Sequence, residues 1–180
     1  MKITYSTLLA CIAALLFWLT IAGDPPRQEI ASATDDNLRQ SYLENAHRWR
    51  YDLQGERIES IHLSTASRFV NSPMTQLGAL EYRGRDNKGQ HWTLTAGGGL
   101  LQENQDELRL NQGVRITERS GDSVLLTSHL RVLLREERAT TGAQVTLTTP
   151  EGVTTARGLD VDLKTDKVRL LHDVESTYEG

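Results

Sequence analysis

The side chains that could do chemistry in this sequence are scattered histidines and a pair of acids. Asp160 and Asp162 share one face of a predicted strand, and paired carboxylates can act as a general acid and base. They alternate with Leu159, Val161 and Leu163, a pattern typical of a polar outer face, so we expect both acids to be solvated. No two histidines have metal-ligand spacing, and the sequence predicts no metal site. The histidines are His47, His62, His91, His129 and His172.

No nucleophile lies beside a base in the sequence. The single cysteine, Cys11, is inside an apolar run, so one chain cannot form a disulfide framework. Gly97-Gly98-Gly99 is not followed by a helical pattern, which argues against a phosphate-binding loop and favours a bend in a strand. We therefore predict no catalytic residue and no cofactor, and a protein that holds a ligand or passes it on.

The carboxy-terminal half of the chain, from His91 to Glu179, repeats one pattern. Each unit opens with Thr followed by Ala or Ser and returns on an alternating strand, with a spacing of about 30 residues. The openings are Thr95-Ala96, Thr127-Ser128 and Thr155-Ala156, with a weaker copy at Thr65-Ala66. The returning strands read Leu108-x-Leu110-x-x-x-Val114-x-Ile116, Val145-x-Leu147 and Val168-x-Leu170-x-x-x-Val174.

Alternation of this kind predicts strands with one apolar face and one polar face. One repeat unit cannot bury its apolar face alone, so several units must stack. The predicted fold is all-β: a twisted antiparallel sheet curled into an open sandwich of repeated strand pairs. An apolar content of 38% suits a thin structure of this kind, and a net charge of -4 without a basic patch gives no sign of nucleic acid binding.

A stretch of about 20 uncharged residues, from Ile3 to Ala22, is long enough to cross a membrane as one helix. Lys2 precedes the stretch and Asp24 follows it, which places the amino terminus in the cytoplasm and the rest outside. The alternative is a cleavable signal peptide, but the apolar run is longer than usual and Thr20-x-Ala22 is only a partial cleavage site. An uncleaved anchor is the favoured interpretation.

The predicted domains are an anchor over residues 1–23, a polar linker over 24–45 and a β domain over 46–180. The linker contains Asp24-Pro25-Pro26, and a short helix is expected near Asp35–Tyr42. Asp86-Asn87-Lys88-Gly89 is a hairpin turn signal.

This order of parts resembles the LptC family of lipopolysaccharide export proteins in the Gram-negative inner membrane. The resemblance runs from Met1 to the end of the chain and depends on order and spacing more than on any single motif. The matching segments include Thr95-Ala96, Leu108-x-Leu110, Gly113-Val114-x-Ile116, Gly158-Leu159, Val168-Arg169-Leu170, Val174 and Tyr178-Glu179.

The resemblance implies a periplasmic β-jellyroll behind one transmembrane helix, with no catalytic residues. Its interior would take the acyl chains of lipopolysaccharide. Its amino-terminal sheet edge would meet an ATP-driven complex of the LptB, LptF and LptG type. Its carboxy-terminal edge would meet a soluble bridge protein of the LptA type.

Strand alternation supplies the candidate residues for contact with lipid, which could equally be ordinary core residues. These candidates are Leu63, Phe69, Tyr82, Trp92, Leu94, Leu108, Leu110, Val114, Ile116, Val145, Leu147, Leu159, Val161, Leu163, Leu170, Val174 and Tyr178. The strand register between Ser60 and Phe69 stays open, because alternation and the Thr65-Ala66 alignment disagree there. Arg157 or Arg169 at the rim could meet lipid phosphates.

Two other functions fit the same sequence. The first is an assembly adaptor that bridges envelope proteins by strand addition while its interior is filled by its own side chains. The second is an anchored hydrolase that uses Asp160, Asp162 and His172.

Overall fold

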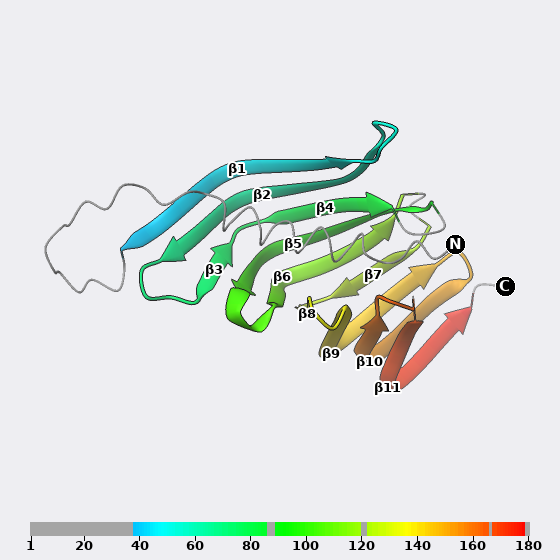
Figure 1. Ribbon diagram of the computed structural model, residues 1–180. Coiled ribbons are helices and arrows are strands. Elements are labelled where there is room, and N and C mark those ends of the chain that lie inside the picture. Colours follow the sequence, from blue (N-terminus) through cyan, green and yellow to red (C-terminus); the bar gives the residue numbers. More distant parts are fainter. Residues whose placement is uncertain (1–37, 86–88, 120–121, 166, 179–180) are drawn as a thin grey trace, which may run out of the picture.

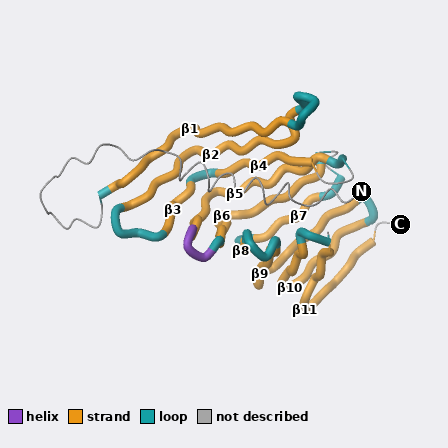
Figure 2. The backbone as a smooth tube through the Cα atoms, in the orientation of Figure 1, coloured by secondary structure: helices purple, strands orange, loops and turns teal. Residues whose placement is uncertain are grey.

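The computed structural model describes residues 38–85, 89–119, 122–165 and 167–178, and its regular structure there is almost entirely β (Figures 1 and 2). The all-β, antiparallel prediction is confirmed. The predicted membrane helix over Ile3–Ala22 lies outside the described residues. The elements are β1 (Arg39–Tyr51), β2 (Arg57–Phe69), β3 (Met74–Leu77), β4 (Leu80–Arg85), β5 (His91–Gln102), the short 3₁₀ helix η1 (Glu103–Gln105), β6 (Glu107–Glu118), β7 (Val124–Thr127), β8 (Leu130–Leu133), β9 (Arg138–Thr149), β10 (Gly152–Asp162) and β11 (Lys167–Tyr178).

The strands form one antiparallel sheet of 11 strands that follows the order of the chain. Its main path runs β1-β2-β3-β5-β6-β7-β9-β10-β11. Two short strands lie beside this path: β4 also pairs with β2 and β5, as β3 does, and β8 also pairs with β6 and β9, as β7 does. Within the described residues β1 and β11 each pair on one side only, so the sheet has two free edges. In Figure 1 the strands follow one another from β1 at the top to β11 at the bottom.

A crease crosses the sheet at about the same level of every long strand. On β5 and β6 the register shifts between Ala96 and Gly98, opposite the left-handed Gln112 and Gly113. A Cβ on Gly97 would lie 2.7 Å from Gln112 Cβ and 2.8 Å from Gln112 O, so only glycine fits that position without displacing backbone. The bend predicted for the three glycines is confirmed, and it lets the strands turn over the apolar face.

The crease explains why the Thr-Ala openings recur in the sequence. Ala96 and Ala156 are buried immediately before it on β5 and β10, Thr127 holds the same level on β7, and Ala66 is buried immediately beyond it on β2. Small side chains are needed there because the sheet folds sharply onto its own apolar face. The sequence repeat is therefore a repeat of crease positions.

Two local predictions were wrong. The short helix expected near Asp35–Tyr42 is absent where the structure describes that segment, because Arg39–Tyr51 form β1 and pair with β2. The sheet thus begins before the expected boundary at residue 46. The hairpin turn at Asp86–Gly89 falls mostly outside the described residues, but the flanking strands β4 and β5 pair antiparallel as it requires.

Candidate functional site

Apolar side chains line one face of the sheet in rows that run from strand to strand. Residues opposite each other in an antiparallel pair lie on the same face, so the register defines each row. The row we call the Leu94 row consists of Ile61, Tyr82, Leu94, Ile116, Leu125 and Leu147. The row we call the Val114 row consists of Leu63, Leu80, Ala96, Val114, Thr127, Val145 and Ala156. We call the face that carries these rows the inner face.

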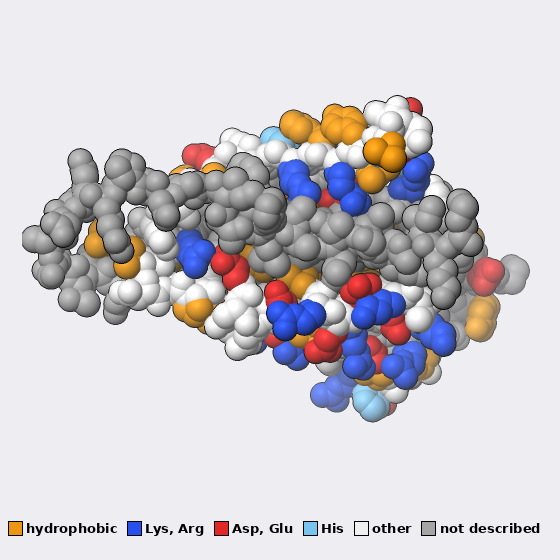
Figure 3. Space-filling model, viewed as in Figure 1, with side chains coloured by type: hydrophobic (Ala, Val, Ile, Leu, Met, Phe, Trp, Pro, Cys, Tyr) orange, Lys and Arg blue, Asp and Glu red, His pale blue; other side chains and the backbone are white. Residues whose placement is uncertain are grey.

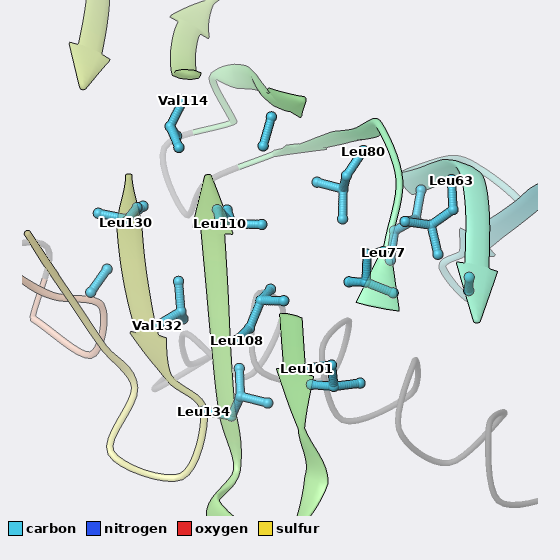
Figure 4. Packing of buried hydrophobic residues seen from close by; sticks show 14 of the residues in the cluster. Leu63, Leu77, Leu80, Leu101, Leu108, Leu110, Val114, Leu130, Val132 and Leu134 are labelled. Atoms are coloured by element: carbon cyan, nitrogen blue, oxygen red, sulfur yellow. The ribbon is translucent and has the colours of Figure 1, made fainter. Parts of the chain in front are cut away.

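The inner face continues beyond the crease as two further rows. One contains Ala66, Leu77, Gly99, Leu110 and Leu130, and the other contains Thr75, Leu101, Leu108, Val132, Ala139 and Val161. Figure 4 shows Leu101, Leu108, Leu110, Val132 and Leu134 gathered together in this part of the cluster. Leu101 is fully buried and Leu110 is 1% exposed, so this end of the inner face is a packed core.

Burial is lower along the Leu94 row. Tyr82, Leu94, Ile116 and Leu125 are only partly buried, although all of them pack against the hydrophobic cluster. When the hydrocarbon of a ligand displaces water from such a partly covered apolar row, binding becomes more favourable by about 0.8 kcal/mol for each methylene buried. The Leu94 row is therefore the part of the sheet best suited to an apolar ligand.

The structure brings most of the predicted lipid-contact residues to this face. Those inside the buried cluster are Leu63, Leu108, Leu110, Val114, Val145 and Leu159. Those partly buried against it are Tyr82, Leu94, Ile116, Val161, Leu163 and Leu170.

Five predicted residues lie outside the cluster. Phe69, Trp92 and Leu147 are half-buried, whereas Val174 is 51% exposed and Tyr178 is 75% exposed. Val174 and Tyr178 belong to β11, which pairs only with β10 in the described structure, so no further strand covers them. The expectation that both are interior residues was wrong because alternation cannot tell an edge strand from a central one.

Sequence reasoning missed several members of the cluster. They are Ile61, Ala66, Leu77, Leu80, Leu101, Leu130, Val132, Leu134 and Ala139. Most of them lie on strands that break or shift at the crease, where strict alternation fails. The left-handed residues Gln112 and Gly113 could have revealed where the alternation of inner and outer residues shifts along the strand. They separate the inward residues Leu110 and Val114 by three residues instead of one.

The other face of the sheet, the outer face, is polar and carries buried acids covered by arginines. Arg138 Nε and Nη2 donate to the two carboxylate oxygens of Asp160 at 2.8 and 2.7 Å, and Arg169 Nη2 donates at 3.0 Å. Glu107 is held in the same way by Arg131, at 2.6 Å, and by Arg109. Figure 3 shows charged side chains of both signs close together on the visible surface.

These arginines set the ionisation of the acids. The hydrogen bonds from Arg138 hold the pKa of Asp160 below its usual value, and the hydrogen bond from Arg131 does the same for the pKa of Glu107. A hydrogen bond from the Thr165 side chain lowers the pKa of Asp162, whose carboxylate also accepts the backbone N–H groups of Lys164 and Thr165. Such carboxylates suit ion pairs and turns better than they suit general acid catalysis.

The expectation that Asp160 is solvated was wrong, because Arg138 and Arg169 cover it and leave it 6% exposed. Arg169 is thereby committed to the outer face. In the described ranges of the chain, no group of three or more His, Cys, Asp or Glu side chains could hold a metal ion. His47 and His62 instead stack on each other, with ring centroids 4.2 Å apart.

Comparison with known families identifies the chain. A family model described as "Lipopolysaccharide-assembly, LptC-related" matches residues 6–179. The chain belongs to the LptC family. Comparison with curated proteins gives no match. Membership in the LptC family gives this protein a role in lipopolysaccharide transport, as a component of the Lpt system that binds lipopolysaccharide.

The LptC family is a family of transport components anchored in the inner membrane, and no enzyme activity defines it. Among the residues that the structure describes, no helix is long and apolar enough to cross a membrane. The apolar inner face and the two sheet edges are the features of this LptC-family protein from which a function can be proposed.

Proposed function

We propose that this LptC-family protein is a membrane-anchored relay for lipopolysaccharide. It accepts the lipid from an ATP-driven inner-membrane complex of the LptB, LptF and LptG type and passes it to a soluble periplasmic protein of the LptA type. Residues 1–23 are the transmembrane anchor with a cytoplasmic amino terminus. Residues 24–45 lead to the periplasmic β-jellyroll domain 46–180, and Arg39–Asn45 already belong to its first strand.

The observation that carries this proposal is the continuity of the apolar inner face across the middle strands of the sheet, from β2 to β9. The Leu94 row passes without a break from β2 through β4, β5, β6 and β7 to β9. Ile61 at its β2 end is buried, and the other members remain partly accessible. Acyl chains need no directional contacts, so such a row can bind them and still release them along its length.

The two edges supply the connections to the partners. An edge strand presents unpaired backbone N–H and C=O groups that a strand of another protein can join. On β11 the side chains are exposed almost throughout, including Val168, Leu171, Val174 and Tyr178. On β1, Tyr42 and Trp49 are exposed. We assign β1 to the transporter side and β11 to the bridge protein.

An assembly adaptor is the second candidate function, and the exposed apolar residues of the same two edges favour it. An adaptor needs only its edges, with the inner face serving as core. The two functions therefore differ in what happens when the inner face alone is changed.

A charged residue at Leu94 separates the two functions. Leu110 is too deeply buried for this purpose, at 1% exposed, since a charge there would unfold either kind of protein. Leu94→Glu places a charge on a half-buried position, and Thr95→Glu is the matched control on the outer face. The relay predicts that the Leu94 variant still assembles with its partners, measured by co-purification, but loses lipopolysaccharide export. Export equal to that of the control would contradict the relay and support the adaptor.

A further inference from the structure

An open groove runs along the crease on the outer face of the sheet. It consists of two adjoining hollows of about 640 and 560 Å³, which share Gln144. The first hollow lies over β6, β7 and β9, and the second lies over β9, β10 and β11. We call both together the crease groove, and the residues that define it are Arg115, Ser128, Gly142, Gln144, Arg157 and Glu175.

The strand register gives the groove its direction. Thr155 of β10 lies opposite Thr146 of β9 on one side and opposite Glu175 of β11 on the other, and these three form one wall. Arg157 lies opposite Gln144 and belongs to the other wall. The groove thus crosses the strands in the order β6, β7, β9, β10 and β11, over roughly 19 Å at about 4.8 Å for each interval between strands.

Two glycines leave the floor of the groove open. A Cβ built on Gly113 or on Gly142 would meet no atom within 4 Å. Gly113 has a φ of +84°, which a larger residue would resist, whereas Gly142 does not have a positive φ. A larger side chain at Gly142 would therefore enter the second hollow without straining the backbone.

The walls of the groove offer both donors and acceptors of hydrogen bonds. Arg115 and Arg157 are exposed, and among the described residues neither guanidinium group has a hydrogen bond or an ion pair. Gln144 is held in place through its backbone, because Thr127 Oγ1 donates to its carbonyl oxygen at 3.0 Å. Its side-chain amide can donate and accept, and the exposed carboxylate of Glu175 accepts.

This geometry excludes several kinds of ligand. Arg115 on β6 and Arg157 on β10 are three strand intervals apart, about 14 Å, so one phosphate cannot contact both. Acyl chains need apolar walls, and Leu126 is the one large apolar side chain exposed among the described residues that line the groove. An added peptide strand must run along a sheet edge, but the groove crosses the strands.

A chain of sugar rings matches the groove on each of these points. Sugar hydroxyl groups donate and accept, so they suit a mixture of guanidinium, amide, carboxylate and threonine hydroxyl groups. The C–H groups on the face of a sugar ring can pack on Leu126, which is 40% exposed. Several rings in a row can follow the length of the groove, and water can bridge the remaining polar groups.

We propose that the crease groove binds an oligosaccharide. Arg115 and Arg157 donate hydrogen bonds to sugar hydroxyls at the two ends of the groove, and Gln144 contacts the rings between them. The site goes beyond the relay, because it lies on the face opposite the acyl-chain rows. The saccharide is either the sugar part of a lipopolysaccharide or a free glycan, and both present the same hydroxyl chemistry.

The test measures binding to the full chain in a detergent that has no sugar headgroup, by isothermal titration calorimetry. The first probe is the oligosaccharide released from lipopolysaccharide by mild acid, which carries no acyl chains. The second is a dextran oligosaccharide, and the third is a Gly-Ser peptide of similar length. Gly142→Leu fills the second hollow, and Arg157→Gln removes a donor. The matched controls are Gly142→Ala and Arg85→Gln, an exposed arginine outside the groove.

We expect the wild type and both controls to bind the released oligosaccharide with equal affinity. Gly142→Leu should weaken this binding at least about 10-fold by filling the space, and Arg157→Gln should weaken it about 3- to 10-fold by removing hydrogen bonds. Thermal unfolding checks that each variant is folded. If Gly142→Leu is not folded, Arg157→Gln decides the outcome.

Equal binding of dextran would support the site with a free glycan as its ligand, whereas preference for the released oligosaccharide would support the sugar part of lipopolysaccharide. No binding of either saccharide by the wild type, or undiminished binding in both groove variants, would overturn the proposal. Tighter binding of the Gly-Ser peptide, lost in Gly142→Leu, would overturn it as well and make the groove a peptide site. The relay does not depend on any of these results.

Discussion

Replacing Glu59 by Gln should change how stability depends on pH. A carboxyl group whose pKa is raised in the folded protein stabilises the fold below its unfolded pKa, and that stability is lost as the pH rises through the folded pKa. For Glu59 this window runs from 4.5, its ordinary value, to about 8. Over that window the full loss would be roughly 5 kcal/mol, at about 1.4 kcal/mol for each pH unit.

The expected effect is smaller because water screens the charge. The Arg50 side chain is 25% exposed and lets water approach the pair, so we expect on the order of 2–3 kcal/mol. Gln has no charge to desolvate, so the free energy of unfolding of the Glu59→Gln variant does not fall in this way as the pH rises. The Glu59→Gln variant should therefore gain stability relative to the wild type between pH 5 and pH 8.5.

Urea titrations of the full chain, followed by tryptophan fluorescence across that pH range, measure the difference. Glu44→Gln, an exposed carboxylate on the same strand pair, is the control for loss of one negative charge. The reasoning is refuted if the wild type gains stability relative to Glu59→Gln as the pH rises. That result would mean that the ion pair with Arg50 outweighs burial and holds the pKa of Glu59 below its ordinary value.

Three further predictions concern the scaffold. Leu110 is 1% exposed, so Leu110→Ala leaves a cavity and should lower the free energy of unfolding in urea by about 2–5 kcal/mol. Leu126 is 40% exposed, so Leu126→Ala should lower it by less than about 1 kcal/mol. Equal losses for the two variants would contradict the faces assigned to these residues. Gly158→Ala forces a side chain into φ +91° and should lower stability by about 1–3 kcal/mol in thermal unfolding, whereas Gly142→Ala, whose added Cβ meets no atom within 4 Å, should change little. Because the pKa of Asp160 is lowered, its carboxylate stabilises the fold above pH 3.8, its ordinary pKa, and this stabilisation is lost on acidification. Asp160→Asn should therefore make the free energy of unfolding less dependent on pH on the acid side. An unchanged dependence in this variant would contradict the assignment.

Periodicity could predict most of the fold because strands obey a rule of period two. The alternation around Leu108, Val145 and Leu159 marked residues that the structure buries. The glycines at 97–99 predicted the bend, since only a residue without a side chain tolerates the close approach of Gln112. These features are local, and local sequence is sufficient to specify them.

Features that depend on neighbouring strands could not be predicted in the same way. The ambiguous register between Ser60 and Phe69 reflects a real change of phase, because Leu63 and Ala66 are both buried although three positions apart. The local sequence does not distinguish Glu59 from other acids in strands, because its partner Arg50 is set by the register with β1. The exposure of Val174 likewise follows from the position of β11 at the sheet edge.

The most direct measurement of the central claim is photo-crosslinking from the inner face during active export. A photo-reactive residue replaces Leu94 or Ile116 in the Leu94 row, and the outward neighbours Thr95 and Arg115, which face each other on the same two strands, serve as controls. A lipid relay predicts lipopolysaccharide adducts at Leu94 and Ile116 that depend on ATP hydrolysis, with few or none at Thr95 and Arg115. Absence of adducts at both inner positions, or equal yields on the two faces, would contradict it.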